Sequence, residues 1–306
     1  MKPIHSNRKI RESQNKISFI TKDSTKKFHL FSLKIVIITV KFIFRICGVM
    51  KIMRREAYDL QLAEHTLFFQ NLPQKFNDLK ILFLSDIHID LVDNIKGKLL
   101  KTVNESEFDI CILGGDYVYK HKKISSGDIR EFYRKLIEII QNKSRKIYGI
   151  LGNHDRYESG VFLESLGVKI LVNESVKIEK DNEFIYISGI DDPCYFGAHD
   201  FDLCEKDIID SDCFKILISH SPGTYKDADK LNYSLSLNGH THGGQICLPG
   251  GNMIFSNTSA PNKLAKGCWK YNNLQGYTSN GIGCSGFAGR LYCKPEVVIL
   301  KLKCAN

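Results

Sequence analysis

Five short polar clusters along the chain carry side chains that could bind metal ions. The clusters are SDIHID (85–90), GGDYV (114–118), GNHD (152–155), SHSP (219–222) and GHTHGGQ (239–245). Together they supply carboxylates, imidazoles and one amide oxygen, from Asp86, His88, Asp116, Asn153, His220, His240 and His242. This mixture suits Mn²⁺, Fe²⁺, Co²⁺ or Zn²⁺, whereas Ca²⁺ prefers oxygen ligands alone. The clusters therefore predict a transition-metal site.

The number of candidate ligands favours two metal ions over one. Seven ligands are too many for a single site that must keep a position open for substrate, but they suit two sites that share a carboxylate. Two divalent ions about 3.5–4 Å apart can clamp a phosphoryl group and activate a bridging hydroxide for in-line attack. Glycines beside the ligands, such as Gly152 and Gly239, let the chain turn sharply and let a bulky substrate approach. Phosphoryl transfer is the chemistry that this set predicts.

Each cluster follows a short apolar run that predicts a buried strand. Seven such runs cover residues 80–84, 108–113, 146–151, 184–190, 214–219, 233–237 and 297–302. Helical patterns at 94–105 and 128–141 lie between the first three runs. This alternation predicts an α/β layered fold, in which ligands bind where strands end. The later runs have little helix between them, so we expect a more antiparallel sheet in the C-terminal half.

The net charge of +9 is concentrated at the N-terminus. Residues 1–55 hold 14 Lys/Arg and 2 Asp/Glu, whereas residues 56–306 hold 29 basic and 32 acidic side chains. A nucleic-acid-binding domain would carry its basic residues on the globular body, so we expect no nucleic-acid partner. Residues 1–28 are polar, basic and without periodicity, and we expect them to form a disordered arm.

Residues 29–55 predict an amphipathic helix that associates with a membrane. The segment is apolar, but its longest uncharged stretch, 35–40, is far shorter than the roughly 20 residues that span a bilayer. Basic residues on one helical stripe could reach anionic head groups; they are Lys27, Lys34, Lys41 and Arg45. A tilted membrane span and a helix packed on the protein's own body are the alternatives. Residues 56–306 would then form the catalytic domain.

The ten cysteines indicate the redox compartment. They are scattered from Cys47 to Cys304 without a C-x-x-C pair, and several lie in apolar runs, where cysteine behaves as a small hydrophobe. The pattern favours a reducing compartment over a disulfide framework, and we assign no cysteine as a metal ligand.

The order D-x-H, G-D, G-N-H-D, a lone His and G-H-x-H resembles the calcineurin-like metallophosphoesterases. The resemblance runs from about Leu79 to the C-terminus. It implies the four-layer fold of that family, a sandwich of two mixed β-sheets flanked by helices. GHTHGGQ and the closing stretch YTSNGIG…R…KPEVVILKL are most similar to small bacterial membrane-associated phosphodiesterases and UDP-2,3-diacylglucosamine pyrophosphatases.

The resemblance also implies a role for each residue of the clusters. One metal would be held by Asp86, His88 and His242, the other by Asn153, His220 and His240, with Asp116 bridging them. His154 would act on the phosphoryl group as general acid or charge stabiliser, with Asp155 as the carboxylate that orients it. Tyr119 stands where many relatives have a second Asp, which is usually not a ligand. Asp191 and Asp192 follow another predicted strand, at 184–190, and from this position we expect them at the rim of the site, within reach of substrate.

We therefore expect a hydrolase with two divalent ions, Mn²⁺ first among the candidates, bound peripherally to the cytoplasmic face of the cell membrane. Its substrate would be a phosphodiester or pyrophosphate, and relatives of this branch indicate a lipid-linked one such as UDP-2,3-diacylglucosamine of lipid A synthesis. A general phosphodiesterase and a protein phosphatase are the alternative enzymes. A metal-stabilised binding scaffold is the non-enzyme alternative, against which the presence of His154 and all seven ligands argues.

Overall fold

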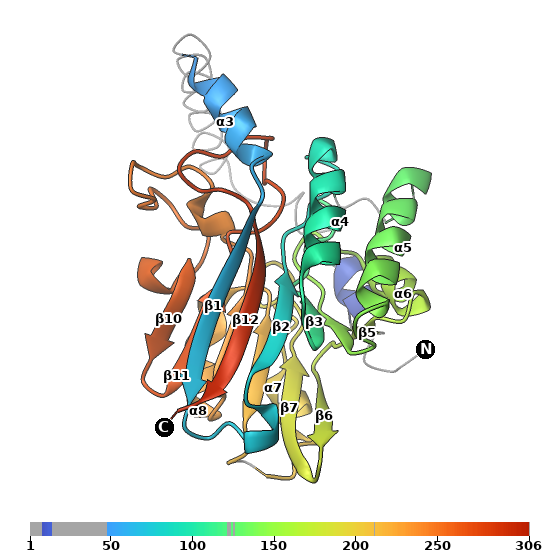
Figure 1. Ribbon diagram of the computed structural model, residues 1–306, viewed down its shortest axis with the longest axis vertical. Coiled ribbons are helices and arrows are strands. Elements are labelled where there is room, and N and C mark those ends of the chain that lie inside the picture. The colour runs from blue at the N-terminus through green and yellow to red at the C-terminus, as the bar shows by residue number, and fades with distance from the viewer. Residues whose placement is uncertain (1–7, 14–47, 121–123, 125, 211, 306) are drawn as a thin grey trace.

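The computed structural model describes residues 8–13, 48–120, 124, 126–210 and 212–305. Within these ranges the chain forms two six-stranded sheets that lie face to face, with helices on their outer sides (Figure 1). The predicted α/β fold with a sandwich of two mixed sheets is thereby confirmed.

The first sheet has the strand order β1-β12-β2-β3-β4-β5. Its strands are β1 (Gln61–Phe69), β2 (Leu79–Leu84), β3 (Ile110–Leu113), β4 (Ile147–Gly149), β5 (Lys169–Ile170) and β12 (Glu296–Cys304). The neighbours from β2 to β5 pair in parallel, through the connecting helices α4 (Lys96–Glu105), α5 (Gly127–Gln141) and α6 (Tyr157–Ser165). Parallel pairing brings the carboxyl ends of β2, β3 and β4 to one edge of the sheet.

The second sheet has the order β10-β11-β9-β8-β7-β6. Its strands are β6 (Glu174–Lys180), β7 (Glu183–Gly189), β8 (Lys215–Ser219), β9 (Leu235–Asn238), β10 (Gly267–Tyr271) and β11 (Leu274–Thr278). Only the two edge pairs are antiparallel, so the expectation of a more antiparallel sheet is wrong at its centre. The segments that connect the central strands are long enough for the crossovers that parallel pairing requires. They contain little helix, because α7 (Phe201–Glu205) has five residues and α8 (Tyr225–Lys230) has six.

Three buried apolar clusters separate the layers. Between the sheets, Ile81 and Phe83 of β2 belong to the same cluster as Ile216 of β8. The alternate residues Leu82 and Leu84 face the other way, into the cluster beneath α4 and α5. A third cluster lies beneath α7 and α8 on the outer side of the second sheet. Because both faces of β2 are buried, its sequence is a continuous apolar run and not an alternating one.

The N-terminal region differs in part from the prediction. Residues 8–13, inside the arm 1–28 that was expected to be disordered, are helical. Of the amphipathic helix predicted over 29–55, the described end lies in α3 (Val49–Ala57), and the rest of that prediction falls outside the described residues. In the part of the chain that the structure describes, no helix has the length and apolar character needed to cross a membrane.

Candidate metal centre

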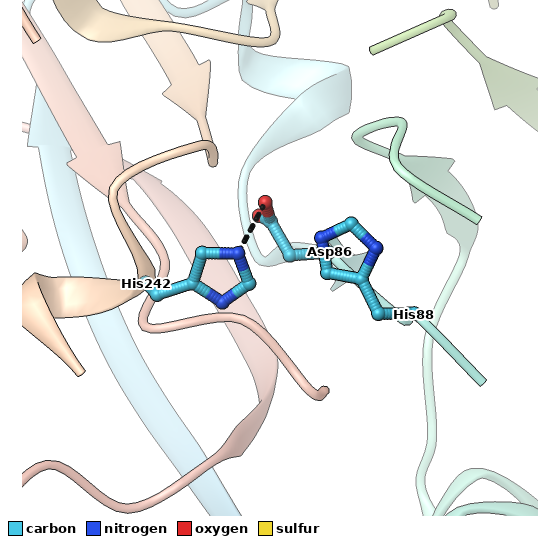
Figure 2. A group of neighbouring side chains, drawn as sticks. All are labelled: Asp86, His88 and His242. Carbon is cyan, nitrogen blue, oxygen red and sulfur yellow. Dashed lines mark ion pairs between the residues drawn. The ribbon is translucent and has the colours of Figure 1, made fainter. Parts of the chain in front are cut away.

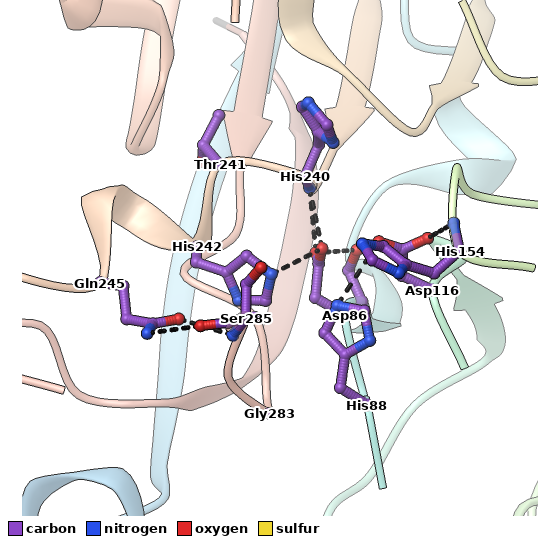
Figure 3. Close-up of polar contacts among 12 residues, drawn as sticks. Asp86, His88, Asp116, His154, His240, Thr241, His242, Gln245, Gly283 and Ser285 are labelled. Carbon is purple, nitrogen blue, oxygen red and sulfur yellow. Dashed lines mark hydrogen bonds and ion pairs between the residues drawn. The ribbon is translucent and has the colours of Figure 1, made fainter. Parts of the chain in front are cut away.

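The five polar clusters meet between the ends of the two sheets. SDIHID, GGDYV and GNHD come after β2, β3 and β4, and SHSP and GHTHGGQ come after β8 and β9. Figure 3 shows the side chains of Asp86, His88, Asp116 and His242 around one point, with His240 above them. The convergence expected from strand ends is therefore what the structure shows.

Asp86, His88 and His242 form the first candidate ligand group (Figure 2). Each offers one ligand atom, and these atoms all lie within 4.8 Å of one another. The Nε2 atom of His242 is 3.5 Å from Oδ1 of Asp86. The three residues predicted to hold one metal are thus placed together.

The Asp116 carboxylate lies between the two predicted metal positions. Its Oδ2 atom is 3.4 Å from Nε2 of His88, a residue of the first position. The same oxygen is 3.1 Å from Nε2 of His220, a residue of the second position. A carboxylate oxygen that faces one imidazole from each group is placed as a bridging ligand would be.

Asn153 and His240, which were predicted for the second position, lie against each other, and the ligand atoms that gather with His220 are those of Asp86 and Asp116. Oδ1 of Asn153 lies 2.8 Å from Nδ1 of His240. The ring of His220 lies 5.3 Å from the ring of His240, centroid to centroid. The Nδ1 atom of His220 hydrogen bonds to the carbonyl oxygen of Gly114 at 2.8 Å, which turns Nε2 toward Asp116 and is the support that metal-binding histidines usually have.

Buried nitrogen atoms without partners indicate that a cation fits here. Among the described residues, both ring nitrogens of His88 and the Nε2 atom of His220 lack a hydrogen-bond partner. Both side chains are fully buried. An unsatisfied buried polar atom costs about 1–3 kcal/mol, so a site that leaves three of them is unfavourable without a further ligand. Divalent ions bound by these imidazoles would satisfy one nitrogen of each ring.

The electrostatics of the site favour metal binding over protonation at two of the imidazoles. Burial lowers the pKa of His88 and of His240 to about 4, so both rings are neutral near pH 7, which is the form that binds metal. Burial raises the pKa of Asp86 to about 6. Against the effect of burial, the charge of His220 holds the pKa of Asp116 well below its usual range, and Asp116 raises the pKa of His220. Positive charge is therefore favoured at His220, where a metal would replace the proton.

The backbone at the candidate ligands is strained. Five of the seven have a positive φ: Asp86 (51°), His88 (38°), Asp116 (57°), His240 (70°) and His242 (51°). Such a conformation costs about 1–3 kcal/mol at a residue other than glycine, and it persists only where the surrounding structure imposes it. Positive φ values are concentrated at the candidate ligands, which indicates that the loop backbone sets the direction of these side chains.

Two glycines allow the ligand loops to approach each other. A Cβ atom on Gly239 would lie 2.3 Å from Oδ2 of Asp86, and one on Gly152 would lie 2.2 Å from Oδ1 of Asp116. Neither carboxylate has room to move away, because both are buried. These glycines are therefore places of close approach, and what approaches them is a carboxylate of the candidate ligand set. The predicted approach of a bulky substrate stays a prediction.

His154 lies beside the ligands, held by two neighbours. Its backbone N–H donates to Oδ1 of Asp116 at 2.8 Å (Figure 3). Its ring stacks on Tyr119 with centroids 4.7 Å apart and lies edge-on to His88 at 5.0 Å. The ring atom Nδ1 hydrogen bonds to the carbonyl oxygen of Tyr119. Tyr119, which from sequence was only a departure from the family pattern, thus supports the His154 ring.

The Asp155 carboxylate is held by backbone N–H groups of two loops. It accepts hydrogen bonds from the backbone N–H groups of Asp116 (2.6 Å), Gly152 (2.8 Å) and Tyr117 (2.9 Å). Burial raises its pKa to about 7. These contacts join the loop after β3 to the loop after β4. We therefore assign Asp155 to holding the two loops together, and its predicted role in orienting the His154 imidazole stays a prediction.

Two further assignments change with the structure. The expectation that Asp191 and Asp192 lie at the rim is wrong, because they are 2% and 0% exposed. Arg290, quoted in the sequence only as part of the closing stretch, is buried and donates to the carbonyl oxygens of Asn280 (2.7 Å) and Gly281 (3.1 Å). One of its Nη atoms also lies 3.5 Å from Nδ1 of His242. Arg290 thus braces the loop behind the first ligand group.

Two mixed sheets with carboxylates and imidazoles converging at the strand ends define a metal-dependent hydrolase of phosphate esters. Residues 79–244 match the family of calcineurin-like phosphoesterases, and the chain belongs to this family. It is therefore a metal-dependent phosphoesterase, and the family uses divalent metals.

Relatives with metallophosphoesterase names cover most of the chain. A metallophosphoesterase of Aquifex aeolicus is 30% identical over 81% of this chain and 94% of its own length. The metallophosphoesterase YkuE of Bacillus subtilis is 28% identical over 82% and 88%, and the phosphodiesterase YaeI of Escherichia coli is 27% identical over 79% and 88%. The solved NAD nucleotidase of Haemophilus influenzae is 14% identical with a TM-score of 0.43, over 67% of this chain and 45% of that one, and this likeness bears on neither activity nor substrate.

Proposed function

We propose that this chain hydrolyses a phosphodiester or a pyrophosphate with two divalent metal ions, Mn²⁺ first among the candidates. The observation that carries the proposal is the position of Asp116, whose Oδ2 atom faces His88 on one side and His220 on the other. When bound, the ions would supply charge neutralisation of the phosphoryl oxygens and a hydroxide at neutral pH. Five of the seven candidate ligands are buried, and electrostatic interactions are stronger where water has little access.

His154 would deliver the proton to the leaving oxygen. A carbonyl oxygen only accepts hydrogen bonds, so the contact with Tyr119 places a hydrogen on Nδ1 of His154. The ring nitrogen that exchanges a proton with substrate is then Nε2. The Tyr119 ring and the Asp116 carboxylate hold the residue from two sides, which is the fixed geometry that a general acid needs.

An apolar hollow beside the metal centre supports a lipid-linked substrate. The hollow has a volume of about 390 Å³ and is lined by both His240 and His242. Its other lining residues include Ile254 and Phe255, which are 61% and 70% exposed. A contiguous patch of exposed apolar side chains commonly marks a place where a ligand or a membrane surface binds. An acyl chain attached to the phosphate group is a ligand of that kind.

The surroundings of this hollow extend the apolar surface toward α3. We call the exposed side chains of Ile52, Leu248, Ile254, Phe255 and Tyr292 the apolar rim. Hydrogen bonds join α3 to the segment 290–292, through Met53 O and Glu56, and that segment to Cys247. The last turn of α3 is basic, with Arg54 and Arg55. Apolar and basic side chains together suit an anionic membrane surface.

These features support the finer form of the proposal. The chain would act peripherally on the cytoplasmic face of the cell membrane, with residues 29–55 as the membrane-associating segment. Its substrate would be an acylated sugar nucleotide such as UDP-2,3-diacylglucosamine, cleaved at its pyrophosphate as in lipid A synthesis. A phosphopeptide would lack the acyl chains that the apolar rim is proposed to cover.

Charging the apolar rim should separate lipid substrates from small ones. We expect the double change Ile254→Asp and Phe255→Asp to lower kcat/KM at least tenfold on UDP-2,3-diacylglucosamine in vesicles, because a buried methylene contributes about 0.8 kcal/mol. Hydrolysis of bis-p-nitrophenyl phosphate should change less than about twofold, because the ligands of the metal centre are untouched. Parallel kinetics on the two substrates measure the effect.

The matched control is Ile209→Asp, which charges a side chain that is 90% exposed and outside the rim. It should leave both activities unchanged. Equal losses on both substrates, or none on the vesicle-borne one, would refute the lipid-linked proposal. Faster turnover of a phosphopeptide than of the acylated pyrophosphate would favour the protein-phosphatase alternative.

A further inference from the structure

Arg8 lies deep in the protein although it belongs to the N-terminal arm. Its side chain is 1% exposed. The Nη2 atom donates to the carbonyl oxygen of Gly152 at 2.9 Å and to that of Asp155 at 2.7 Å. These two carbonyls flank Asn153 and His154. One guanidinium therefore binds the backbone on both sides of the two GNHD residues that act in the proposed function.

The remaining contacts of Arg8 form a complete set of partners for a buried cation. Nη1 pairs with the Asp191 carboxylate, and Nε donates to Oε1 of Glu12 at 3.1 Å. The guanidinium carbon lies 3.7 Å from the centroid of the Phe196 ring. A buried charge is costly unless it is paired and hydrogen bonded. This arrangement also explains why Asp191 is buried and not at the rim of the site.

The helical residues 8–13 are attached on both sides of the Arg8 side chain. Oε1 of Glu12 accepts a hydrogen bond from the backbone N–H of Tyr157, the first residue of α6, at 2.7 Å. On the other side, Nη1 of Arg11 donates to the carbonyl oxygens of Phe196 (3.2 Å) and Gly197 (2.8 Å). The segment therefore connects the loop after β4 with the loop after β7.

We propose that Arg8 is a positioning residue that fixes the GNHD loop, so that the N-terminal segment forms part of the frame of the active site. The inference rests on the proposed function of Asn153 and His154. The loop is held from two directions: the Asp155 carboxylate binds backbone N–H groups, including that of Gly152, and Arg8 binds the carbonyls of Gly152 and Asp155. A forked, planar guanidinium can reach both carbonyls, whereas a lysine ammonium is a point charge.

This arrangement has a consequence for truncated chains. Removing residues 1–55 to make the enzyme independent of membranes would also remove Arg8, whose partners lie beside the metal centre. The buried Asp191 carboxylate would then lose its pairing with Arg8. Loss of activity in such a chain would report on the GNHD loop as well as on membrane association.

The test uses the full chain with Mn²⁺ and an alkyl phosphodiester, whose leaving group needs a proton, and compares Arg8→Ala and Arg8→Lys with Lys9→Ala. We expect Arg8→Ala to lower kcat about 10²-fold, the loss that a shift of about 1 Å in a catalytic group can cause. KM and metal content should change little. Lys9 is exposed on the same helical segment, so its variant removes the same charge and should keep wild-type kinetics.

Two further readouts distinguish positioning from a general effect on folding. Hydrogen exchange of the backbone amides of residues 150–157 should be faster in Arg8→Ala than in the wild type, and unchanged in Lys9→Ala. Guanidinium ion at tens of millimolar should restore part of kcat in Arg8→Ala, because it can occupy the space that the Arg8 guanidinium leaves. It should not stimulate the wild type. If Arg8→Ala does not fold, Arg8→Lys should show the lower kcat and the faster exchange.

Different results would overturn the positioning role of Arg8 and the proposed function on which it rests. A wild-type chain that binds Mn²⁺ but hydrolyses no diester would overturn the proposed function, and exchange at 150–157 would still decide the role of Arg8. Wild-type kcat and wild-type exchange in Arg8→Ala would overturn the positioning role. So would a joint loss of metal and thermal stability that guanidinium does not reverse.

Discussion

Replacing Asp116 with alanine should remove both metal ions and abolish hydrolysis of bis-p-nitrophenyl phosphate. The reason is geometric: one carboxylate oxygen lies 3.4 Å from Nε2 of His88 and 3.1 Å from Nε2 of His220, so the same side chain serves both ligand groups. Metal ions supply several kcal/mol of transition-state stabilisation, and each 1.36 kcal/mol is tenfold in rate. We expect a loss of about 10³-fold or more, measured as turnover together with metal content.

A suitable control is Asp93→Ala, which removes a carboxylate that is 76% exposed and lies close to the SDIHID cluster in sequence. It should keep metal and turnover. Adding Mn²⁺ to chelator-treated protein should restore the wild type and Asp93→Ala, but not Asp116→Ala. The bridging role is contradicted if Asp116→Ala retains two ions and near-normal turnover.

His154→Ala should lose activity while keeping its metal. We expect turnover to fall by about 10²–10⁴, the usual contribution of a positioned general acid. The residue faces the ligands but is held through Tyr119 and through its own backbone, so its removal leaves the predicted ligand set intact. Turnover and metal content are measured on the same preparation. The control is His199→Ala, which removes an exposed histidine.

The leaving group distinguishes the roles open to His154. The loss should shrink on a substrate whose leaving group needs no proton, such as p-nitrophenolate, and grow on an alkyl diester. Equal losses on both would indicate that His154 stabilises charge and donates no proton. His154 also lies close enough to His88 and Asp116 to share a metal with them, so loss of metal in the variant would make it a ligand.

The candidate ligands could be predicted from sequence because their position depends on local signals. Asp86 and Asp116 come directly after apolar runs that form β2 and β3, and these strands lie next to each other in parallel. An apolar run predicts a buried strand, and the residues that follow the run lie where that strand ends. Each of the seven predicted runs overlaps a strand of the structure, and each of the two helical patterns overlaps a helix.

Other features depend on contacts that leave no periodic signal. The strand β1 (Gln61–Phe69) has exposed or half-exposed residues over most of its length, so its sequence lacks an apolar run. The partners of Arg8 outside its own helical segment lie about 140 to 180 positions away, and its arm is polar and basic throughout. Tyr119 and Arg290 act on His154 and on the loop beside His242 through tertiary contacts alone. The strand β1 and the contacts of Arg8, Tyr119 and Arg290 can therefore be recognised only in the folded chain.

Titration of the metal-free chain with Mn²⁺ tests the central claim most directly. Hydrolysis of bis-p-nitrophenyl phosphate is followed at each addition, with bound metal measured in the same sample. The claim of two ions bridged by Asp116 predicts that turnover rises and saturates at two equivalents of bound Mn²⁺ per chain. Full turnover at one equivalent, or none at any metal content, would contradict it.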